Sequence, residues 1–488
     1  VVEERATGGA GKPRTLLGPT PDGFDAAPTF GKGGLRWVRA DAPRRGRGGD
    51  AWYAFEASDG YAAATAELKR LRGDPNELAA HVAAHPYHAP ALVVLAKFVL
   101  KLNKAELAGP LLARATSAFE AAMGGGSEKT RDVIKRGVLR ADAADPEHAA
   151  LFRALLTRAR CAAMTGAAET AANLFRFLLA LDPTGDPCGV LLRLDADLYE
   201  ANDDAALLEL HDRPLPVAAW AGSVEPLFDD APRSCAAPCR AGGAGLPEGT
   251  TALLPGLALN RALALRRSDL DDPSARKRAV AAVADALAAH PQLLTSMLRA
   301  CGVDPDSDRT TTFDFREISW HEHFRKHVRE AHLANAYAAG ALPLAIDACC
   351  LRGRKFWSQP DALRLLHDGA KVLTKRLGPG KASTKTLAIV DNMWSATALA
   401  KYAAVPVEEF GDRFAQLGPD AAEGFDDSLL TADAARRAAD ERRMLQNGGV
   451  RRVAGGGGGF ADARAMVDHV LAQLPEEVRA DFEAQLAA

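Results

Sequence analysis

The stretch EHAALFRALLTRARCAAMTGAAETAANLFRFLLALDPTGDP, residues 147–187, predicts the fold of this chain. Apolar residues recur at helical spacing on both sides of Gly166, so we expect two helices joined by a tight corner. An alanine five positions after this glycine, a phenylalanine nine after it and a proline seventeen after it match the tetratricopeptide pattern, as Ala171, Phe175 and Pro183. The stretch therefore predicts a helical hairpin of the tetratricopeptide kind.

Related hairpins are predicted on both sides of this stretch. Two apolar helical faces flank a corner at Asn103-Lys104, and a further returning helix ends at His290-Pro291. Because each hairpin buries only one face, neighbouring hairpins must stack. We expect an all-α fold in which tetratricopeptide-like hairpins form an irregular α-solenoid, with a short N-terminal extended segment and disordered Gly/Pro-rich loops.

Composition supports this fold class and sets the limits of its regions. Alanine and leucine favour helices, whereas aromatic residues, which favour strands, make up only 6% of the 488 residues. A short hairpin is expected from Leu35–Arg39 and Ala51–Phe55. The predicted regions are 1–60, largely irregular; 61–210, a helical-repeat core; 211–256, a loop insertion; 257–400, a second helical region; 401–459, a polar, Gly-rich segment of low order; and 460–488, C-terminal helices.

Charge and cysteine content exclude several classes of protein. Lys and Arg number 60 against 63 Asp and Glu, a net charge of -3, which argues against a wholly basic nucleic-acid binder. Seven cysteines in 488 residues do not suggest a disulfide framework, so we expect a reducing, intracellular compartment. No apolar run is long enough for a transmembrane helix, and no membrane partner is expected. The N-terminus lacks a signal peptide and an initiator Met, which suggests a fragment or a trimmed start.

Two loops faintly resemble ligand-binding motifs. Residues 378–384 resemble a phosphate loop, but Lys375 stands where the first glycine is needed and Ala382 replaces the required Ser or Thr. Asp304, Asp306 and Asp308 have the alternate spacing of a calcium loop, but Arg309 occupies the glycine position and Phe315 the glutamate position. A solvated inter-helix loop and an acidic turn are the favoured interpretations.

Three further groups suggest metal or RNA binding. His321, His323, His327 and His332 lie close together with Glu322, but the final histidine of the HExxH motif is missing, and charged neighbours favour a solvated helix. Cys235 and Cys239 lack the second pair that structural zinc usually needs. Arg44–Gly49 offers charge to RNA phosphates, although a flexible loop is favoured. We therefore expect no cofactor, no bound metal and no catalytic residue.

Several stretches carry a family resemblance: Tyr53–Glu56; Asp74–Asn76 with His85–His88; Gly137–Phe152; Leu178–Pro183 with 186–192; and, more weakly, Leu474–Val478. Together they resemble the transcription factor 25 family, also described as subunit 1 of the ribosome quality control complex. The similarity covers residues 50–210 well and 250–375 loosely. His85 stands where the family usually has Asn, and the family's lysine-rich N-terminal region and C-terminal tail are not evident.

The resemblance implies a non-enzymatic, cytosolic adaptor, also found in the nucleus. It would act on large ribosomal subunits whose nascent chain is stuck, beside the ubiquitin ligase listerin, ubiquitin and an AAA segregase that extracts the chain. Any RNA contact would be made by the family's lysine-rich N-terminal region, which is not evident in this sequence. Family members are also described as transcriptional repressors, so a nuclear corepressor stays open, and a metalloprotein using the histidine cluster is the third hypothesis. Tyr87, His88, Asp186 and Pro187 match family stretches and are candidate protein-binding residues, although turn formation and hairpin packing are the favoured explanation of these four.

Overall fold

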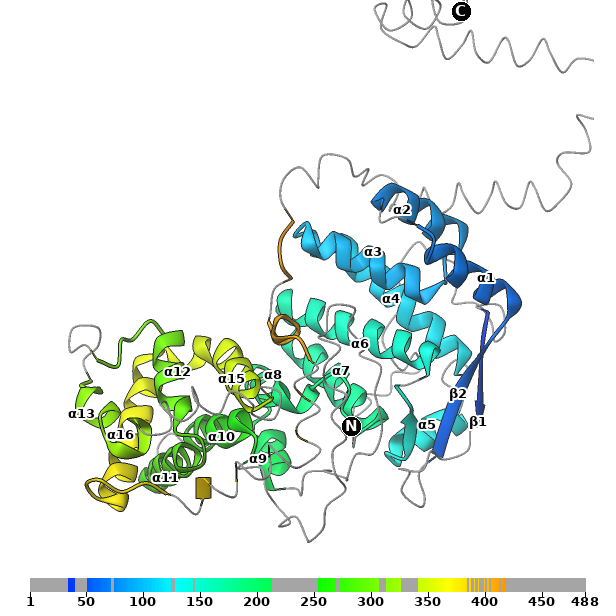
Figure 1. The fold of residues 1–488 in the computed structure, drawn as a ribbon. Coiled ribbons are helices and arrows are strands. Elements are labelled where there is room, and N and C mark those ends of the chain that lie inside the picture. The colour runs from blue at the N-terminus through cyan, green and yellow to red at the C-terminus, as the bar shows by residue number, and fades with distance from the viewer. Residues whose placement is uncertain are drawn as a thin grey trace, which may run out of the picture. The chain divides into compact units, whose positions relative to one another are not determined.

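The computed structural model describes residues 34–39, 51–71, 74–123, 128–143, 145–183, 185–212, 253–268, 272–306, 313–325 and 341–383, together with positions 386–387, 390, 394, 399, 402, 405–411 and 414–417. The chain divides into two compact units, 1–426 and 427–488, and all the described residues belong to the first. Figure 1 shows the first unit as a series of helices with a small sheet at its N-terminal part.

The sheet begins with the predicted hairpin, which is confirmed. Strand β1, Leu35–Arg39, pairs antiparallel with β2, Ala51–Ala57. A third strand, β3, Leu139–Ala141, pairs parallel with β2 and was not predicted. Three residues are too few to show a strand period, and their pairing partner lies far back in the sequence. Aromatic rings on one face of the hairpin pack against the helices. Phe55 contacts Phe119, and their ring centroids lie 5.3 Å apart.

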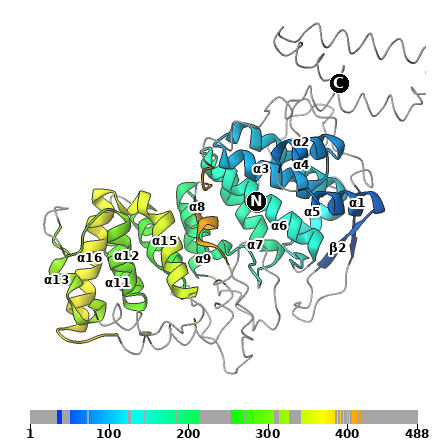
Figure 2. The same cartoon turned by 45° about the horizontal axis from the view of Figure 1, so that its top comes forward.

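The first helical region contains the two hairpins that the sequence predicted. Asn103 (φ 61°) forms the first corner and Gly166 (φ 82°) the second, where glycine tolerates this left-handed backbone. Asp145 caps the start of the second hairpin by accepting hydrogen bonds from two backbone N–H groups. Figures 1 and 2 show the two hairpins packed beside each other. The helices are α1, Asp59–Leu68; α2, Pro75–Ala84; α3, Ala89–Lys101; α4, Ala105–Ala122; α5, Glu128–Lys135; α6, Pro146–Met164; and α7, Ala168–Leu181.

The second helical region follows two short helices and buries a core of its own. Leu259, Val283, Leu287, Met297 and Leu366 are completely buried in it. This core and the hairpins confirm the predicted all-α solenoid class. The elements are η1, Val190–Leu192; α8, Leu194–Glu200; α9, Asp204–Asp212; α10, Pro255–Ser268; α11, Pro273–Ala289; α12, Gln292–Ala300; α13, Arg316–Ser319; α15, Ala341–Trp357; α16, Pro360–Leu377; and η5, Val407–Phe410.

The start of the segment predicted to have low order, 401–459, is packed where the structure describes it. Tyr402, Phe410 and Phe414 are buried, and Leu417 N donates to Lys101 O at 3.0 Å. The prediction of low order was based on the polar and Gly-rich sequence later in this segment. The packing is made instead by a few aromatic residues at irregular spacing. The limits of the predicted regions otherwise stay predictions. Within the described part of the chain, no helix has the combined length and apolar character that crossing a membrane requires.

Candidate protein-binding groove

A groove of about 930 Å³ opens between α7, α8 and α9. Helix α7 separates two faces along its length. Ala171, Phe175 and Leu178 are buried, whereas Glu169 and Arg176 line the groove from the other side. Asn202, with φ 58°, makes the tight corner that returns α9 alongside α8. The floor is apolar and is formed by Ala172, Leu179, Ala180, Leu194, Leu198 and Leu210.

The charged residues of the groove are mostly acidic. Three carboxylates, those of Glu169, Asp203 and Glu209, line it together with one guanidinium, that of Arg176, which leaves a formal charge of -2. Arg176 Nη2 lies 2.5 Å from Asp203 Oδ2, and the two side chains are 34% and 37% exposed. Burial alone would raise the pKa of Asp203, but hydrogen bonds from Arg176 and the backbone of Ala206 lower it overall. An apolar floor with an acidic rim suits a protein segment that carries apolar and basic side chains.

A buried network of charges lies behind the groove and joins the two helical regions. Asp197 of α8 is its centre, and its side chain is 1% exposed. It accepts from Arg193 Nε at 2.8 Å and from Arg352 Nη2, on α15, at 2.5 Å. Burial alone would raise the pKa of Asp197, but the two guanidinium groups outweigh it and the pKa is lowered. The carboxylate is therefore charged in the folded protein and holds α8 against α15.

The same network also fastens the end of the described chain. Arg160 of α6 forms an ion pair with Glu409 and donates to Glu408 O at 3.0 Å. Arg193 Nη1 donates to Glu409 O at 3.1 Å. The guanidinium groups of Arg160 and Arg193 also stack on rings, 4.0 Å from the centroid of Phe414 and 3.9 Å from that of Phe175. The network therefore sets the position of η5 against the first helical region.

A second branch of buried hydrogen bonds continues from α8 into α10 and α15. Asn260 donates to Asp195 Oδ2 at 2.6 Å and accepts from Trp357 Nε1 at 2.8 Å. Burial raises the pKa of Asp195 to about 6, although the bond from Asn260 opposes the shift. These groups are enclosed in the protein, so their arrangement serves to fix helix positions.

Comparison with known proteins identifies the family. The sequence model of the family described as Transcriptional repressor TCF25 matches residues 53–424. The chain belongs to this family. The human protein named Ribosome quality control complex subunit TCF25 is 23% identical over 362 residues, which are 72% of this chain and 45% of the human protein. The chain thus spans less than half the length of that relative, and no solved structure matches it.

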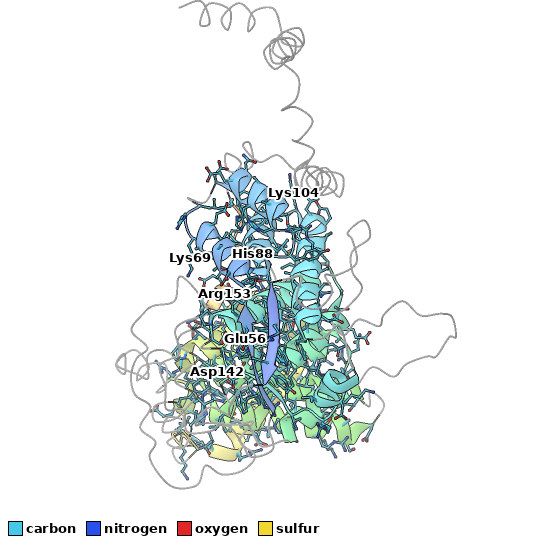
Figure 3. All side chains as sticks on the ribbon, turned by 90° about the vertical axis from the view of Figure 1, so that its right-hand side faces the viewer. Glu56, Lys69, His88, Lys104, Asp142 and Arg153 are labelled. Carbon is cyan, nitrogen blue, oxygen red and sulfur yellow. The ribbon has the colours of Figure 1, made fainter. Side chains whose placement is uncertain are left out.

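Membership of the TCF25 family confirms the resemblance on which the four candidate residues were chosen. His88 lies at the start of α3 (Figure 3) and is buried there. Its Nε2 lies 3.0 Å from Thr65 Oγ1, and Tyr87 precedes it in the same turn. Asp186 is 2% exposed and has a left-handed φ of 38°, and it accepts from Val190 N, Leu191 N and Tyr402 Oη. Pro187 follows it and is half-buried. None of the four lines the groove, and their binding role stays a prediction.

Two of the motifs singled out in the sequence, the histidine cluster and the glycine-containing loop 378–384, contact each other in this TCF25 family member. His321 Nε2 donates to Gly378 O at 3.0 Å, in the loop that ends α16. His323 donates from Nε2 to Leu287 O at 3.0 Å and accepts at Nδ1 from Ser383 N at 3.3 Å. Because both ring nitrogens of His323 have protein partners, this side chain holds the loop and has no lone pair left for a metal.

The other candidate motifs are placed only in part. Asp304 Oδ1 accepts a hydrogen bond from Asp306 N, and Asp306 Oδ1 accepts one from Trp320 Nε1. These hydrogen bonds stabilise a turn. The remaining candidates lie outside the described residues; they are Asp308, His327, His332, Cys235, Cys239 and Arg44–Gly49.

Sequence reasoning missed the groove and the buried network. The spacing of Arg193 and Asp197, four residues apart, is a readable signal for a helical charge pair. Arg352 comes 155 residues after Asp197, and no local pattern connects the two. The groove arises from the corner at Asn202, which sets two short helices against α7, and short helices give a weak periodic signal.

Proposed function

We propose that this chain is a non-enzymatic adaptor of the ribosome quality control machinery, active in the cytoplasm and also present in the nucleus. Membership of the TCF25 family and the name of the human relative support the proposal. The observation that carries the structural part is the acidic groove with its apolar floor on a helical-repeat scaffold. Helical solenoids of this kind offer extended surfaces for binding other proteins.

The proposed mechanism is positional. The chain would hold large ribosomal subunits, the ligase listerin, ubiquitin and the AAA segregase in one geometry, which raises their effective concentrations. Within that assembly the groove would receive a partner segment with apolar anchors and Lys or Arg side chains. The buried network centred on Asp197 keeps the groove helices at a constant position against α15. No covalent chemistry by this chain is required.

Sedimentation of the tagged protein on a ribosome gradient tests the proposal. We expect stall-dependent migration with large subunits that carry ubiquitylated nascent chains. Migration at the top of the gradient with and without stalling would contradict the adaptor role.

The groove has its own test within that experiment. The double variant Glu169→Lys/Glu209→Lys reverses two exposed groove charges and should abolish comigration. The matched control Glu77→Lys/Glu106→Lys makes the same change in net charge at exposed positions of α2 and α4, away from the groove, and should behave as wild type. Equal comigration of both variants would remove the groove from the proposal.

A nuclear helical-repeat corepressor is the second candidate function, favoured by the description of the matching family as a transcriptional repressor. It would use the same scaffold to bind other nuclear proteins. Imaging of the protein during translational stress separates the two candidates. Protein that stays wholly nuclear favours the corepressor, whereas cytoplasmic protein on stalled subunits favours the adaptor.

A further inference from the structure

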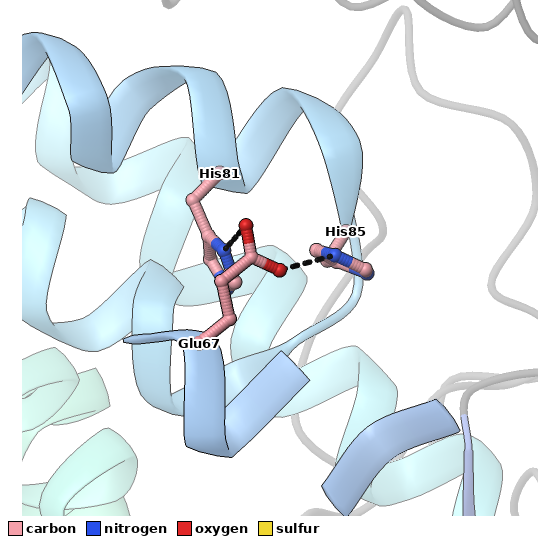
Figure 4. Close-up of side chains that lie close together, drawn as sticks. All are labelled: Glu67, His81 and His85. Atoms are coloured by element: carbon pink, nitrogen blue, oxygen red, sulfur yellow. Dashed lines mark ion pairs between the residues drawn. The ribbon is translucent and has the colours of Figure 1, made fainter. Parts of the chain in front are cut away.

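Three potential metal ligands meet where α1 and α2 end. Glu67 comes from the last turn of α1, His81 from the last turn of α2, and His85 directly follows α2. Glu67 Oε1 lies 3.6 Å from His81 Nδ1, and Glu67 Oε2 lies 3.5 Å from His85 Nε2. One ligand atom from each residue lies within 4.8 Å of the other two. Figure 4 shows the carboxylate between the two rings. Among the described residues this is the group whose donors are close enough to share a cation.

A chain of hydrogen bonds determines which nitrogen of His81 carries its lone pair. Thr65 Oγ1 donates to Tyr61 O at 3.0 Å, so it accepts from His88 Nε2 at 3.0 Å. His88 Nδ1 is then the acceptor, and His81 Nε2 donates to it at 3.4 Å. Neutral His81 consequently presents an unprotonated Nδ1 toward Glu67. In metal sites, a protein acceptor for the second ring nitrogen orients a histidine ligand in the same way.

Among the residues that the structure describes, the lone pair on His81 Nδ1 lacks a suitable partner. The side chain is 1% exposed, and Nδ1 is buried without a hydrogen bond. It faces a carboxylate oxygen, which is also an acceptor, so the contact is repulsive unless a cation stands between them.

We propose that Glu67, His81 and His85 bind a Zn²⁺ ion that links the ends of α1 and α2. Two imidazole nitrogens and one carboxylate form a zinc donor set, and tetrahedral ligands about 2.0–2.1 Å from the metal lie about 3.4 Å from one another. The two distances to Glu67, 3.6 and 3.5 Å, end on its two different oxygens, and one ligand atom from each residue lies within 4.8 Å of the other two, so small side-chain rotations bring the three donors to this spacing. The side chains of Glu67 and His85 are 56% and 38% exposed, so the fourth position is open to water.

The link has a structural consequence for the first helices. Helix α1 buries only Tyr61 and Ala64, so a small apolar surface holds it in place. A metal shared by both helices would add a cross-link at their ends. The turn that contains His88 would then support the metal site, because the His88 ring orients the His81 ligand.

Zn²⁺ titration of the full-length, chelator-treated chain by calorimetry tests the site. The informative variants are Glu67→Gln and His85→Asn, because both side chains are partly exposed and both replacements remain polar. Each removes one donor and should weaken binding at one site at least about tenfold, the lower end of what even indirect disturbance of a metal site produces. Glu77→Gln, on the exposed side of α2, is the matched control and should leave the titration unchanged.

Thermal unfolding supplies a second measurement that does not depend on counting sites. Zn²⁺ should raise the Tm of wild type and of Glu77→Gln, and the increase should disappear in both ligand variants. Metal-free Tm values and circular dichroism of all four proteins should agree, which shows that the variants fold. No zinc binding by wild type, or equal binding by wild type, Glu67→Gln and His85→Asn, would overturn the proposal.

Discussion

Replacing Asp197 by Asn should destabilise the joint between the two helical regions more than an ordinary surface substitution does. Asp197 is the buried carboxylate that accepts from both Arg193 and Arg352. Asparagine has nearly the same shape but brings no charge, and its amide group directs N–H toward a guanidinium. Two buried cations would then lose the anion that they share, while Glu200, 3.4 Å from Arg352, remains.

The expected loss is large compared with the stability of a folded domain. Removing one partner of a buried ion pair costs about 3–5 kcal/mol, because a buried charge is left without compensation. We expect about 4 kcal/mol for Asp197→Asn, a substantial part of the roughly 5–15 kcal/mol by which native proteins are stable. Urea unfolding followed by tryptophan fluorescence measures this loss, since Trp357 is completely buried on α15.

A double-mutant cycle tests the physical reason. Arg352→Met removes one of the cations that Asp197 neutralises. If uncompensated charge is the cause, Asp197→Asn combined with Arg352→Met should be less destabilised than the sum of the single variants, by about 1–3 kcal/mol. A cost below about 1 kcal/mol for Asp197→Asn, or simple additivity in the cycle, would refute the reasoning.

Three further predictions concern other buried positions. Burial raises the folded-state pKa of Asp195 from 3.8 to about 6, so its contribution to stability is present below about pH 4 and is lost as pH rises to 6. Asp195→Asn should abolish this loss of about 3 kcal/mol in urea titrations across that range. Gly369→Ala would place a Cβ 2.4 Å from a valine of α11 and should cost about 1–3 kcal/mol, whereas Gly60→Ala in α1, where the new Cβ would lie 4.0 Å from Ser58 Oγ, should stabilise by about 0.5–1 kcal/mol; thermal unfolding compares the two. Tyr402→Phe removes the 2.9 Å bond to Asp186 and should cost about 1.5–3 kcal/mol in urea unfolding; no loss would show that the bond contributes nothing.

Local patterns predicted the helical hairpins and their corners. The helical spacing of apolar residues around Gly166 and the corner at Asn103 are short-range features, so the sequence alone contains them. The β1–β2 hairpin was predictable for the same reason. Strand β3 was not, because its three residues acquire a strand role only by lying against β2.

The candidate sites were less predictable than the fold. His81 and His85 are four residues apart, a spacing that could have indicated a shared ligand, but Glu67 joins them only through the packing of α1 on its neighbours. Asp186 was selected from family similarity, and the structure shows its carboxylate bonded to η1 and Tyr402. The segment around Phe410 was predicted to have low order, because its composition is polar and its few aromatic residues follow no period.

The sequence by itself therefore determined the helical class, the hairpin corners and membership of the TCF25 family, since all of these depend on residues close together along the chain. The tertiary structure decided the groove beside α7, the shared ion pairs of Asp197 and the meeting of Glu67 with two histidines. These features join side chains from separate helices, and their positions depend on how whole helices pack. Burial then changes the free energy of each charge, and neither packing nor burial can be read from local periodicity.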